Sequence, residues 1–420
     1  MHPNPTKTRW WILALLFLIT TNNYLDRIIL GILSPVILED MHFSKLEYGY
    51  VSAAFQAAYA GGFLLMGWWI DRVGTRKGYA GAVALWSVAA GLHALSTSWL
   101  QLSFWRALLG LGESGNFPAA IKAVTEWFPK RDRAFATGIF NAGTNVATMI
   151  GPPVFVWMNA HFGWRTCFLI TASTGALCLA AWWFFYRLPR EHKWVNEAEL
   201  AIIESDPEEK VEARVGWAQA LRIRQTYGFA LAKFFSDPVW WFYLTWLTLY
   251  FKEARGLSLE QIGWALPVIY LMADFGSVFG GWMSGFLIRR GWPNGKARKV
   301  TMAFFALCMP VAATAVVAPK TWMAVALISL ATSAHQGWSA NLYTTVSDVF
   351  PKSAVASVTG LGGFLGGVGG IVFTALLPGY LITYFGYLPV FVIMGSFHLL
   401  GWMCVHIFLG DMRKLGESAV

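Results

Sequence analysis

Residues 10–36 read WWILALLFLITTNNYLDRIILGILSPV. About 20 apolar residues suffice to cross a bilayer as a helix, so this stretch is long enough to span a membrane. It nevertheless carries two adjacent opposite charges, Asp26 and Arg27, well inside that length. An ionisable side chain at membrane depth costs at least about 2.5 kcal/mol and usually serves a function. The stretch therefore predicts a transmembrane helix that places both charges in a polar cavity.

The whole chain has the composition of a helical membrane protein. Its 420 residues are 56% hydrophobic and 13% charged, whereas soluble domains carry about 25% charged residues. Long apolar blocks alternate with short polar connections, which is the pattern of successive membrane spans. We predict twelve blocks, at 10–35, 47–69, 78–97, 100–126, 132–159, 165–187, 235–253, 261–288, 298–318, 321–347, 354–383 and 387–409.

The basic residues are distributed unequally between the two sides of these spans. The termini and the connections on their side hold 24 of the 32 basic residues, and the connections on the other side hold five. The remaining three, Arg27, Arg106 and Lys122, fall inside apolar blocks. Because Lys and Arg favour the cytoplasmic side, we expect both termini in the cytoplasm. This bias accounts for the net charge of +9 without a nucleic-acid partner. The first block is too long and too charged for a cleaved signal peptide.

The chain divides into two related halves. We expect six spans in residues 1–187, six in 235–420, and between them a solvated cytoplasmic linker, 188–234, with a helix start at Asn196 and a short surface helix at 216–224. Two short motifs recur in both halves: Phe128-Pro129-Lys130 matches Phe350-Pro351-Lys352, and Phe162-Gly163 matches Phe385-Gly386. Parallel repeats of this kind place a substrate site near the membrane midplane.

The sequence argues against several other kinds of site. Its four cysteines all lie in apolar blocks without CxxC spacing, so we expect neither a disulfide nor a metal site. The glycine-rich stretch from Gly360 to Gly370 lacks a following GK[ST], so it does not indicate a phosphate-binding loop. Those glycines favour close helix contact or bending. No HExxH or GxSxG motif is present, which disfavours a membrane-embedded enzyme. We expect no cofactor, with protons as the coupling ion.

The connection after the second block carries a family signature. Residues 67–77 read GWWIDRVGTRK, which resembles the G-x-x-x-D-R-x-G-x-[RK]-[RK] motif of the major facilitator superfamily. The resemblance implies a conformational gate that clasps the cytoplasmic ends of the spans. The implied gate residues are Gly67, Asp71, Arg72, Gly74 and Arg76. In the second half Gly285 stands where the aspartate would be, so a weaker or absent clasp is expected there.

The fourth block carries Arg106 and Glu113, seven residues apart. Two helical turns place them nearly on one face, about 10 Å apart along the axis. We expect them to share a cavity with Asp26 and Arg27, and Arg106 to pair with Asp26 or Glu113. Opening such a pair changes a carboxylate's affinity for protons, which provides a proton-binding switch. A structural ion pair that fixes helix packing is the alternative.

Two motifs narrow the resemblance. Asn23-Tyr24-Leu25-Asp26-Arg27 and the segment from Arg106 through Glu113 to Pro118 resemble the first and fourth helices of the anion:cation symporter family. The resemblance implies that Asp26 and Glu113 bind protons and that Arg106 is their pairing arginine. It implies that Arg27 holds the substrate carboxylate, for which a guanidinium offers two parallel donors. Tyr24 and Tyr59 match tyrosines that face the cavity.

Polar residues on two further spans are candidate substrate ligands. Span five carries a polar stripe, Asn141, Thr144 and Asn145. Span ten is unusually polar, with His335, Gln336, Trp338, Asn341 and Tyr343 among its residues. Hydroxyl-rich ligands need such groups, but they equally join helices to one another. The span-ten stretch is most similar to that of hexuronate transporters. Asp274, on span eight, has no evident basic partner.

The sequence therefore predicts an all-α membrane protein with the major facilitator fold and twelve transmembrane helices. We expect a monomer in a bacterial inner membrane that imports a sugar-acid anion with protons, with glucuronate or galacturonate as substrate. Two alternatives remain open. One is symport of an aldonate or aldarate, and the other is exchange or uniport of organic anions or phosphate esters without proton coupling.

Overall fold

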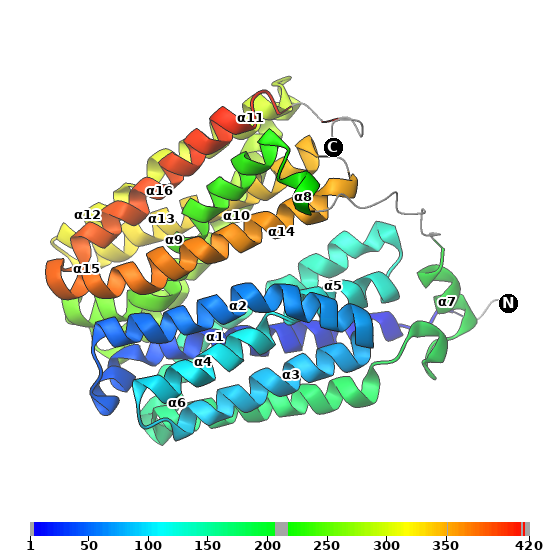
Figure 1. Ribbon diagram of the computed structural model, residues 1–420, viewed down its shortest axis with the longest axis horizontal. Coiled ribbons are helices and arrows are strands. Elements are labelled where there is room, and N and C mark those ends of the chain that lie inside the picture. The colour runs from blue at the N-terminus through cyan, green and yellow to red at the C-terminus, as the bar shows by residue number, and fades with distance from the viewer. Residues whose placement is uncertain (1–3, 206–216, 351, 413–414, 416–420) are drawn as a thin grey trace. The chain divides into compact units, whose positions relative to one another are not determined.

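The computed structural model describes residues 4–205, 217–350, 352–412 and 415. Within these ranges the chain forms helices joined by connections, and it forms no strands. Residues 206–216, which the sequence assigns to the linker, lie outside the described residues. Contacts divide the chain into two compact units: Met1–Met41 with Ala54–Lys210, and His42–Ala53 with Val211–Val420. Figure 1 shows the course of the chain.

The first unit holds the helices of the first six predicted spans, and α2 begins within the second unit. Its elements are α1 (Thr8–Met41), α2 (Lys45–Val73), α3 (Thr75–Leu92), η1 (His93–Leu95), α4 (Trp99–Glu113), α5 (Asn116–Trp127), α6 (Lys130–Phe185), η2 (Pro189–Glu191) and α7 (Glu197–Ile203). Helix α1 packs along α6, and α3 packs against α4 and α6.

The second unit holds the later helices. They are α8 (Trp217–Ala220), α9 (Arg224–Arg255), α10 (Leu259–Arg289), α11 (Asn294–Cys308), α12 (Val311–Val317), α13 (Thr321–Val349), α14 (Lys352–Gly369), the π-helical η3 (Gly370–Leu376), α15 (Leu377–Phe385) and α16 (Tyr387–Phe408). Helices α14 and α16 flank α9, and α10 packs along α13 (Figure 1).

Seven helical segments among the described residues are long and apolar enough to cross a membrane. One of them, Phe135–Phe185, joins two predicted spans across Gly163, whose φ of 77° ends one helix and starts the next. The other predicted spans correspond to α2, to α4 with α5, to α9 and to α13, which carry more polar residues. The major facilitator fold is thus confirmed at the level of its helices.

The two recurring motifs have similar local structure in both units. Gly386, like Gly163, adopts a positive φ, 75°, between two successive spans. A left-handed conformation suits glycine because a Cβ would clash with the backbone. Phe128 and Phe350 each end a helix in an extended conformation. The repeats noticed in the sequence therefore mark equivalent turns.

Several boundaries differ from the sequence prediction. The fourth span breaks into α4 and α5 after Glu113, and the ninth breaks at Pro310. Helix α9 begins at Arg224, inside the range assigned to the linker, so Lys233 is a helix residue and not a loop residue. The predicted surface helix at 216–224 is limited to Trp217–Ala220.

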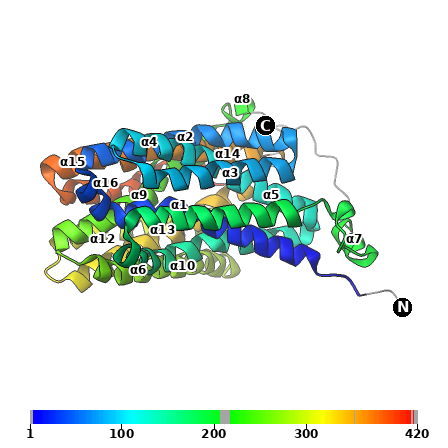
Figure 2. The ribbon, with the colours of Figure 1, turned by 90° about the horizontal axis from the view of Figure 1, so that it is seen from below.

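The linker is also less free than a solvated connection would be. Asn196 caps α7, as its sequence predicts, by accepting a hydrogen bond from the Glu199 backbone N–H. Glu199 itself is buried and accepts hydrogen bonds from the backbone N–H groups of Thr8 and Arg9 at 3.1 and 3.0 Å. The carboxylate thus satisfies the free N–H groups at the start of α1. Figure 2 shows α7 beside the start of α1.

Candidate functional site

The predicted charges of the first and fourth spans meet inside the first unit. Arg27 Nε donates to Glu113 Oε2 at 2.9 Å. The Glu113 side chain is fully buried and that of Arg27 is 11% exposed. A buried ion pair with little access to water is costly to separate, because each charge loses its partner in a low dielectric. The Arg27–Glu113 pair is therefore a closed, buried contact between α1 and α4.

Aromatic rings surround the Arg27 guanidinium. Its carbon lies 4.4 Å from the Tyr59 ring centre, 4.7 Å from that of Tyr24 and 5.5 Å from that of Phe55. A guanidinium over an aromatic face gains cation–π energy and keeps its N–H groups free for acceptors in its plane. The two tyrosines inferred from the family resemblance are thus placed at the arginine that was expected to bind the carboxylate.

Arg106 contacts the backbone of Arg27. We expected it to pair with Asp26 or Glu113, but Glu113 pairs with Arg27, the neighbouring arginine. Arg106 Nη2 instead donates to the Arg27 carbonyl oxygen at 3.2 Å, and its guanidinium lies 4.6 Å from the Phe55 ring centre. Its charge still acts on both carboxylates. The four charged residues expected to share a cavity thus lie close together, and the pairing role of Arg106 stays a prediction.

Asp26 lies at the buried side of the cluster. It is 1% exposed, and neither carboxylate oxygen has a hydrogen-bond partner that meets normal geometry among the described residues. Thr171 lies beside it but donates its hydroxyl to the Phe168 carbonyl. The charges of Glu113 and Arg106 act on Asp26. Asp26 thus belongs to the same buried charged cluster as Arg27, Arg106 and Glu113.

The break between α4 and α5 positions Glu113. Gly110 and Gly112 lie so close to Phe55 and Trp86 that an added Cβ would stand 2.5 Å from the Phe55 carbonyl oxygen and 2.7 Å from the Trp86 nitrogen. The end of α4 is therefore held tightly against α2 and α3, and Glu113 is its last residue. The sequence predicts one continuous block at 100–126, and the structure divides it after Glu113.

The polar stripe of span five is divided between two faces of α6. Thr144 is buried and donates to the Asn141 carbonyl at 2.8 Å and to Asn145 Oδ1 at 3.2 Å. Asn141 and Asn145 are exposed. Their side chains are thus accessible to a ligand, whereas the Thr144 hydroxyl is committed within its own helix.

The predicted gate motif makes contacts within the first unit. Asp71 forms an ion pair with Lys122 at 2.9 Å, and Gly74 adopts a φ of 83° before α3. Arg76 Nη2 donates to the Trp183 carbonyl at 2.7 Å. Lys122, which the sequence places inside an apolar block, is thus the partner of the motif's aspartate. Gly67 has open space around it, and the Arg72 guanidinium lies over the Trp68 ring.

The second unit, where Gly285 replaces the aspartate of the motif, has a different ion pair between α11 and α13. Arg298 Nε pairs with Asp348 at 3.1 Å, and its Nη1 donates to Ser284 at 2.9 Å and Asn341 at 3.3 Å. The Asn341 amide also donates to the carbonyls of Gly280 and Gly337. Asn341, a predicted substrate ligand, is therefore fully used in joining α10, α11 and α13.

The other candidate ligands on span ten divide into buried and accessible side chains. His335 is buried, lies 3.1 Å from the His398 Nε2 through its Nδ1, and stacks on Trp240. Trp338 is fully buried. Gln336 is half-buried, and Tyr343 is 49% exposed. Gln336 and Tyr343 are thus the accessible members of the predicted set, and the others form the interior of the unit.

Sequence reasoning missed a second buried ion pair. Lys233 and Asp237, one turn apart on α9, approach to 2.8 Å, and Lys233 Nζ donates to the Tyr343 hydroxyl at 2.7 Å. The i, i+4 spacing of opposite charges would have revealed this pair had α9 been extended to Arg224. Asp274 is half-buried, and the structure gives it no ion-pair partner among the described residues.

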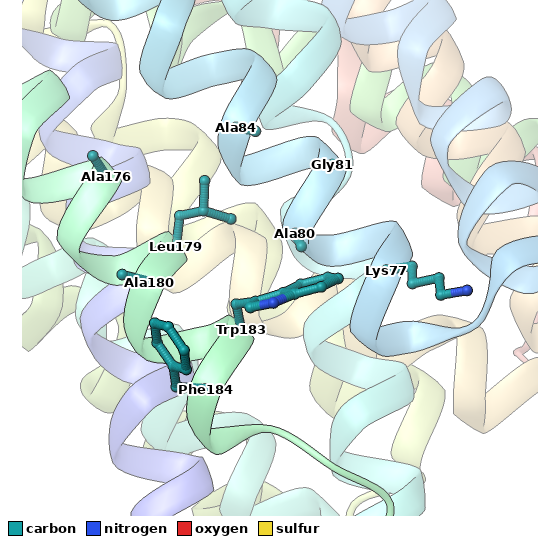
Figure 3. A pocket seen from close by; sticks show the side chains of 9 residues that line it. All are labelled: Lys77, Ala80, Gly81, Ala84, Ala176, Leu179, Ala180, Trp183 and Phe184. Carbon is teal, nitrogen blue, oxygen red and sulfur yellow. The ribbon is translucent and has the colours of Figure 1, made fainter.

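A shallow groove lies elsewhere in the first unit, between α3 and the end of α6 (Figure 3). Its lining is alanine, glycine, leucine and aromatic side chains, with Lys77 at one end. In Figure 3 the Trp183 ring reaches from α6 toward α3. This surface offers a sugar acid few polar partners, so it is not the candidate site. Among the described residues, no group of three or more His, Cys, Asp or Glu side chains is arranged to hold a metal ion.

Residues 16–374 match the model of the Major Facilitator Superfamily. The chain belongs to this superfamily of membrane transporters. The transporter is 32% identical to the hexuronate transporter of Escherichia coli K12 over 94% of this chain and 93% of that protein. It is 30% identical to a D-galactonate transporter of Escherichia coli O6:H1, over 98% of both chains.

The fold of this transporter also matches a solved structure. A bacterial homologue of the human lysosomal transporter Spinster superposes with a TM-score of 0.78 over 98% of this chain and 99% of that one, at 19% identity. At this identity the match shows the fold alone. The predicted family and the resemblance to bacterial hexuronate transporters are confirmed, and the chain is a transporter and not an enzyme.

Proposed function

We propose that this transporter imports a sugar-acid anion together with protons across a bacterial inner membrane, by alternating access, and that hexuronates are its substrates. The observation that carries the proposal is the Arg27–Glu113 pair, 2.9 Å apart and enclosed by Tyr24, Tyr59 and Phe55. An arginine of this kind recognises a carboxylate through two parallel hydrogen bonds.

The pairing supplies the coupling. While Glu113 is ionised it occupies the Arg27 Nε donor, so a substrate carboxylate competes with it. Protonation neutralises Glu113 and releases Arg27 for the substrate, so that binding of the anion and of the proton favour each other. Asp26, buried beside them, is the second proposed proton-binding group. Arg106 keeps a positive charge beside both acids throughout.

Hydroxyl recognition is assigned to accessible polar side chains. In the first unit these are the exposed amides of Asn141 and Asn145. In the second unit they are Gln336 and Tyr343, while His335, Trp338 and Asn341 support the helix that carries them. The relatives named above transport a hexuronate and a galactonate, which both combine one carboxylate with several hydroxyls.

Uptake into proteoliposomes tests the proposal. Labelled galacturonate should accumulate when the outside is acidified, and Glu113→Gln should abolish the response to the pH gradient. Asp40→Asn is the matched control, since Asp40 also pairs with an arginine, Arg165, but its side chain is 46% exposed. Uptake that ignores the gradient in the wild type would leave exchange or uniport as the function.

Competition identifies the substrate class. Glucuronate and galacturonate should compete with labelled galacturonate better than galactonate, galactarate or a sugar phosphate. Stronger competition by galactonate would assign the chain to aldonate symport, and competition by the sugar phosphate alone would assign it to exchange of phosphate esters.

A further inference from the structure

The second unit contains a buried cation whose three N–H groups are all engaged. Lys233 Nζ contacts Asp237 Oδ1 at 3.0 Å and Oδ2 at 2.8 Å, and donates to the Tyr343 hydroxyl at 2.7 Å. Its side chain is 4% exposed. Lys233 lies nine residues into α9, about 14 Å from the start of the helix, so water at the helix end does not solvate it.

Helix α14 is shaped around this ion pair. A Cβ at Gly366 would overlap the Asp237 carboxylate, and one at Gly362 would meet the Lys233 stem at 3.1 Å and the Phe229 ring still closer. Two of the glycines noted in the sequence, Gly362 and Gly366, thus make room for these two charged side chains. Gly369 also lets α14 approach the backbone of α9 at Phe234.

Stability does not explain why the pair is present. A buried ion pair is commonly no more stabilising than apolar residues of the same volume, because desolvation offsets the attraction. Charges kept inside membrane segments generally mark a path for ions or substrates. The composition of this cluster, a cation with a carboxylate and a tyrosine hydroxyl, repeats that of the Arg27 site.

The two ligands of Lys233 are more accessible than Lys233 itself. The Asp237 side chain is 20% exposed, and Tyr343 is 49% exposed. A ligand therefore meets the carboxylate and the phenol first. An anion can take the place of the Asp237 carboxylate only after that group is neutralised by a proton. The ammonium, the phenol and the protonated carboxyl then offer three kinds of donor to one anion.

We propose that Lys233, Asp237 and Tyr343 form a second carboxylate-binding site, within the second half of the transporter, that takes up a proton on Asp237 with each anion. The inference rests on the proposed function for the substrate class. The other titratable groups near the site are His335 on α13, which feels the charge of Lys233, and His398 on α16, which contacts His335. Helix α14 presents glycines there and adds no charge.

The test is binding of labelled galacturonate to the purified full-length protein in nanodiscs at pH 5.5 and pH 8.0. The wild type should bind two anions per chain at pH 5.5. Lys233→Met/Asp237→Asn should bind one, because it removes the site without leaving a buried charge alone. Lys45→Met/Glu253→Gln, which removes a half-exposed ion pair in the same unit, should still bind two.

A second set of variants isolates the site. Arg27→Met should retain one bound anion, with affinity at least about tenfold weaker at pH 8.0 than at pH 5.5, since one proton accompanies the anion. Adding Lys233→Met/Asp237→Asn to Arg27→Met should abolish it. One anion per chain in both the wild type and Lys233→Met/Asp237→Asn would overturn the second site and leave the proposed function intact. A wild type that binds no galacturonate would overturn both.

Discussion

Arg27 is held by three aromatic rings and one carboxylate, so its charge and its shape both matter. A lysine has the same charge but lacks the planar fork and the stacking surface. We expect Arg27→Lys to raise the KM for hexuronate uptake by tenfold or more, which corresponds to about 1.4 kcal/mol or more of lost binding. Uptake kinetics in proteoliposomes give the measurement.

Arg165→Lys provides the control for this change. Arg165 also pairs with an aspartate and stacks on a tryptophan, but its side chain is 44% exposed. Exposed ion pairs of this kind contribute little stabilising energy. The KM of Arg165→Lys for hexuronate uptake should therefore match that of the wild type. An unchanged KM in Arg27→Lys would remove Arg27 from carboxylate recognition.

His192 gives the linker a pH dependence. Burial lowers the pKa of His192, which accepts a hydrogen bond from the Trp194 N–H through Nδ1 and contacts the Phe185 carbonyl through Nε2. Because the pKa in the docked segment lies below the ordinary value of 6.5, docking is stable above pH 6.5 and weakens as the pH falls below it. The charges of Arg187 and Glu199 also act on His192.

Amide hydrogen exchange measures this effect. After correction for intrinsic rates, protection of residues 188–196 should decrease between pH 7.5 and pH 5.5. His192→Gln cannot take up the proton, so its protection should not change over that range. Equal losses of protection in both proteins would assign the effect to another group.

For single residues, the sequence predicts which charged side chains lie close together, but it does not predict which of them form ion pairs. Asp26, Arg27 and Glu113 were recognisable because charges in apolar blocks are costly and therefore few. The choice of Arg27 over Arg106 as the partner of Glu113 depends on the break after Glu113 and on close packing at Gly110 and Gly112. Neither feature has a periodic signal in the sequence.

Among the helices, α10 and α13 make an unusually close contact. A Cβ added at Gly276 would overlap the backbone of Ser333. We expect Gly276→Ala to push these helices apart and to destabilise the protein by about 1–3 kcal/mol, as overpacking typically does. Gly281→Ala lies on the same helix in open space and should have no such effect. Thermal unfolding of both variants in detergent decides between them.

The start of α1 depends on a residue from the linker. Glu199 accepts hydrogen bonds from the backbone N–H groups of Thr8 and Arg9. Glu199→Ala should therefore destabilise the first turn of α1 by about 0.5–2 kcal/mol, as loss of a helix cap does. Hydrogen exchange at residues 8–12 should increase. Glu197→Ala is the control, because Glu197 is exposed on the same short helix. Equal exchange in both variants would contradict a capping role.

Among the helices, the sequence predicts some starts correctly and misses contacts between distant segments. The Asn196 helix start was predicted from its cap and confirmed. The docking of α7 on α1 was not predicted, because it joins Glu199 to residues 190 positions away, and a charged segment has the composition of a solvated linker in either case. Likewise α9 was started too late because Lys233 and Asp237 lower the apolar character of its first turns.

For the molecule as a whole, the twelve spans rested on apolar periodicity, and their order agrees with a solved relative of the fold over nearly the entire chain. The repeated Phe-Gly and Phe-Pro motifs supported the two halves, since each glycine and phenylalanine marks an equivalent turn. Periodicity is strongest for long elements, so spans were easier to predict than the breaks inside them.

The orientation of the whole chain remains a prediction from its basic residues, and it is directly testable. Single cysteines are introduced at Lys193 and at Lys320, both exposed, after Cys167, Cys178, Cys308 and Cys404 have been replaced by serine. Because basic connections stay in the cytoplasm, a membrane-impermeant maleimide should label Lys320→Cys in intact cells and should label Lys193→Cys only after the cells are opened. The reverse pattern would invert the topology, and the uptake direction proposed for the charged site would then have to be reversed with it.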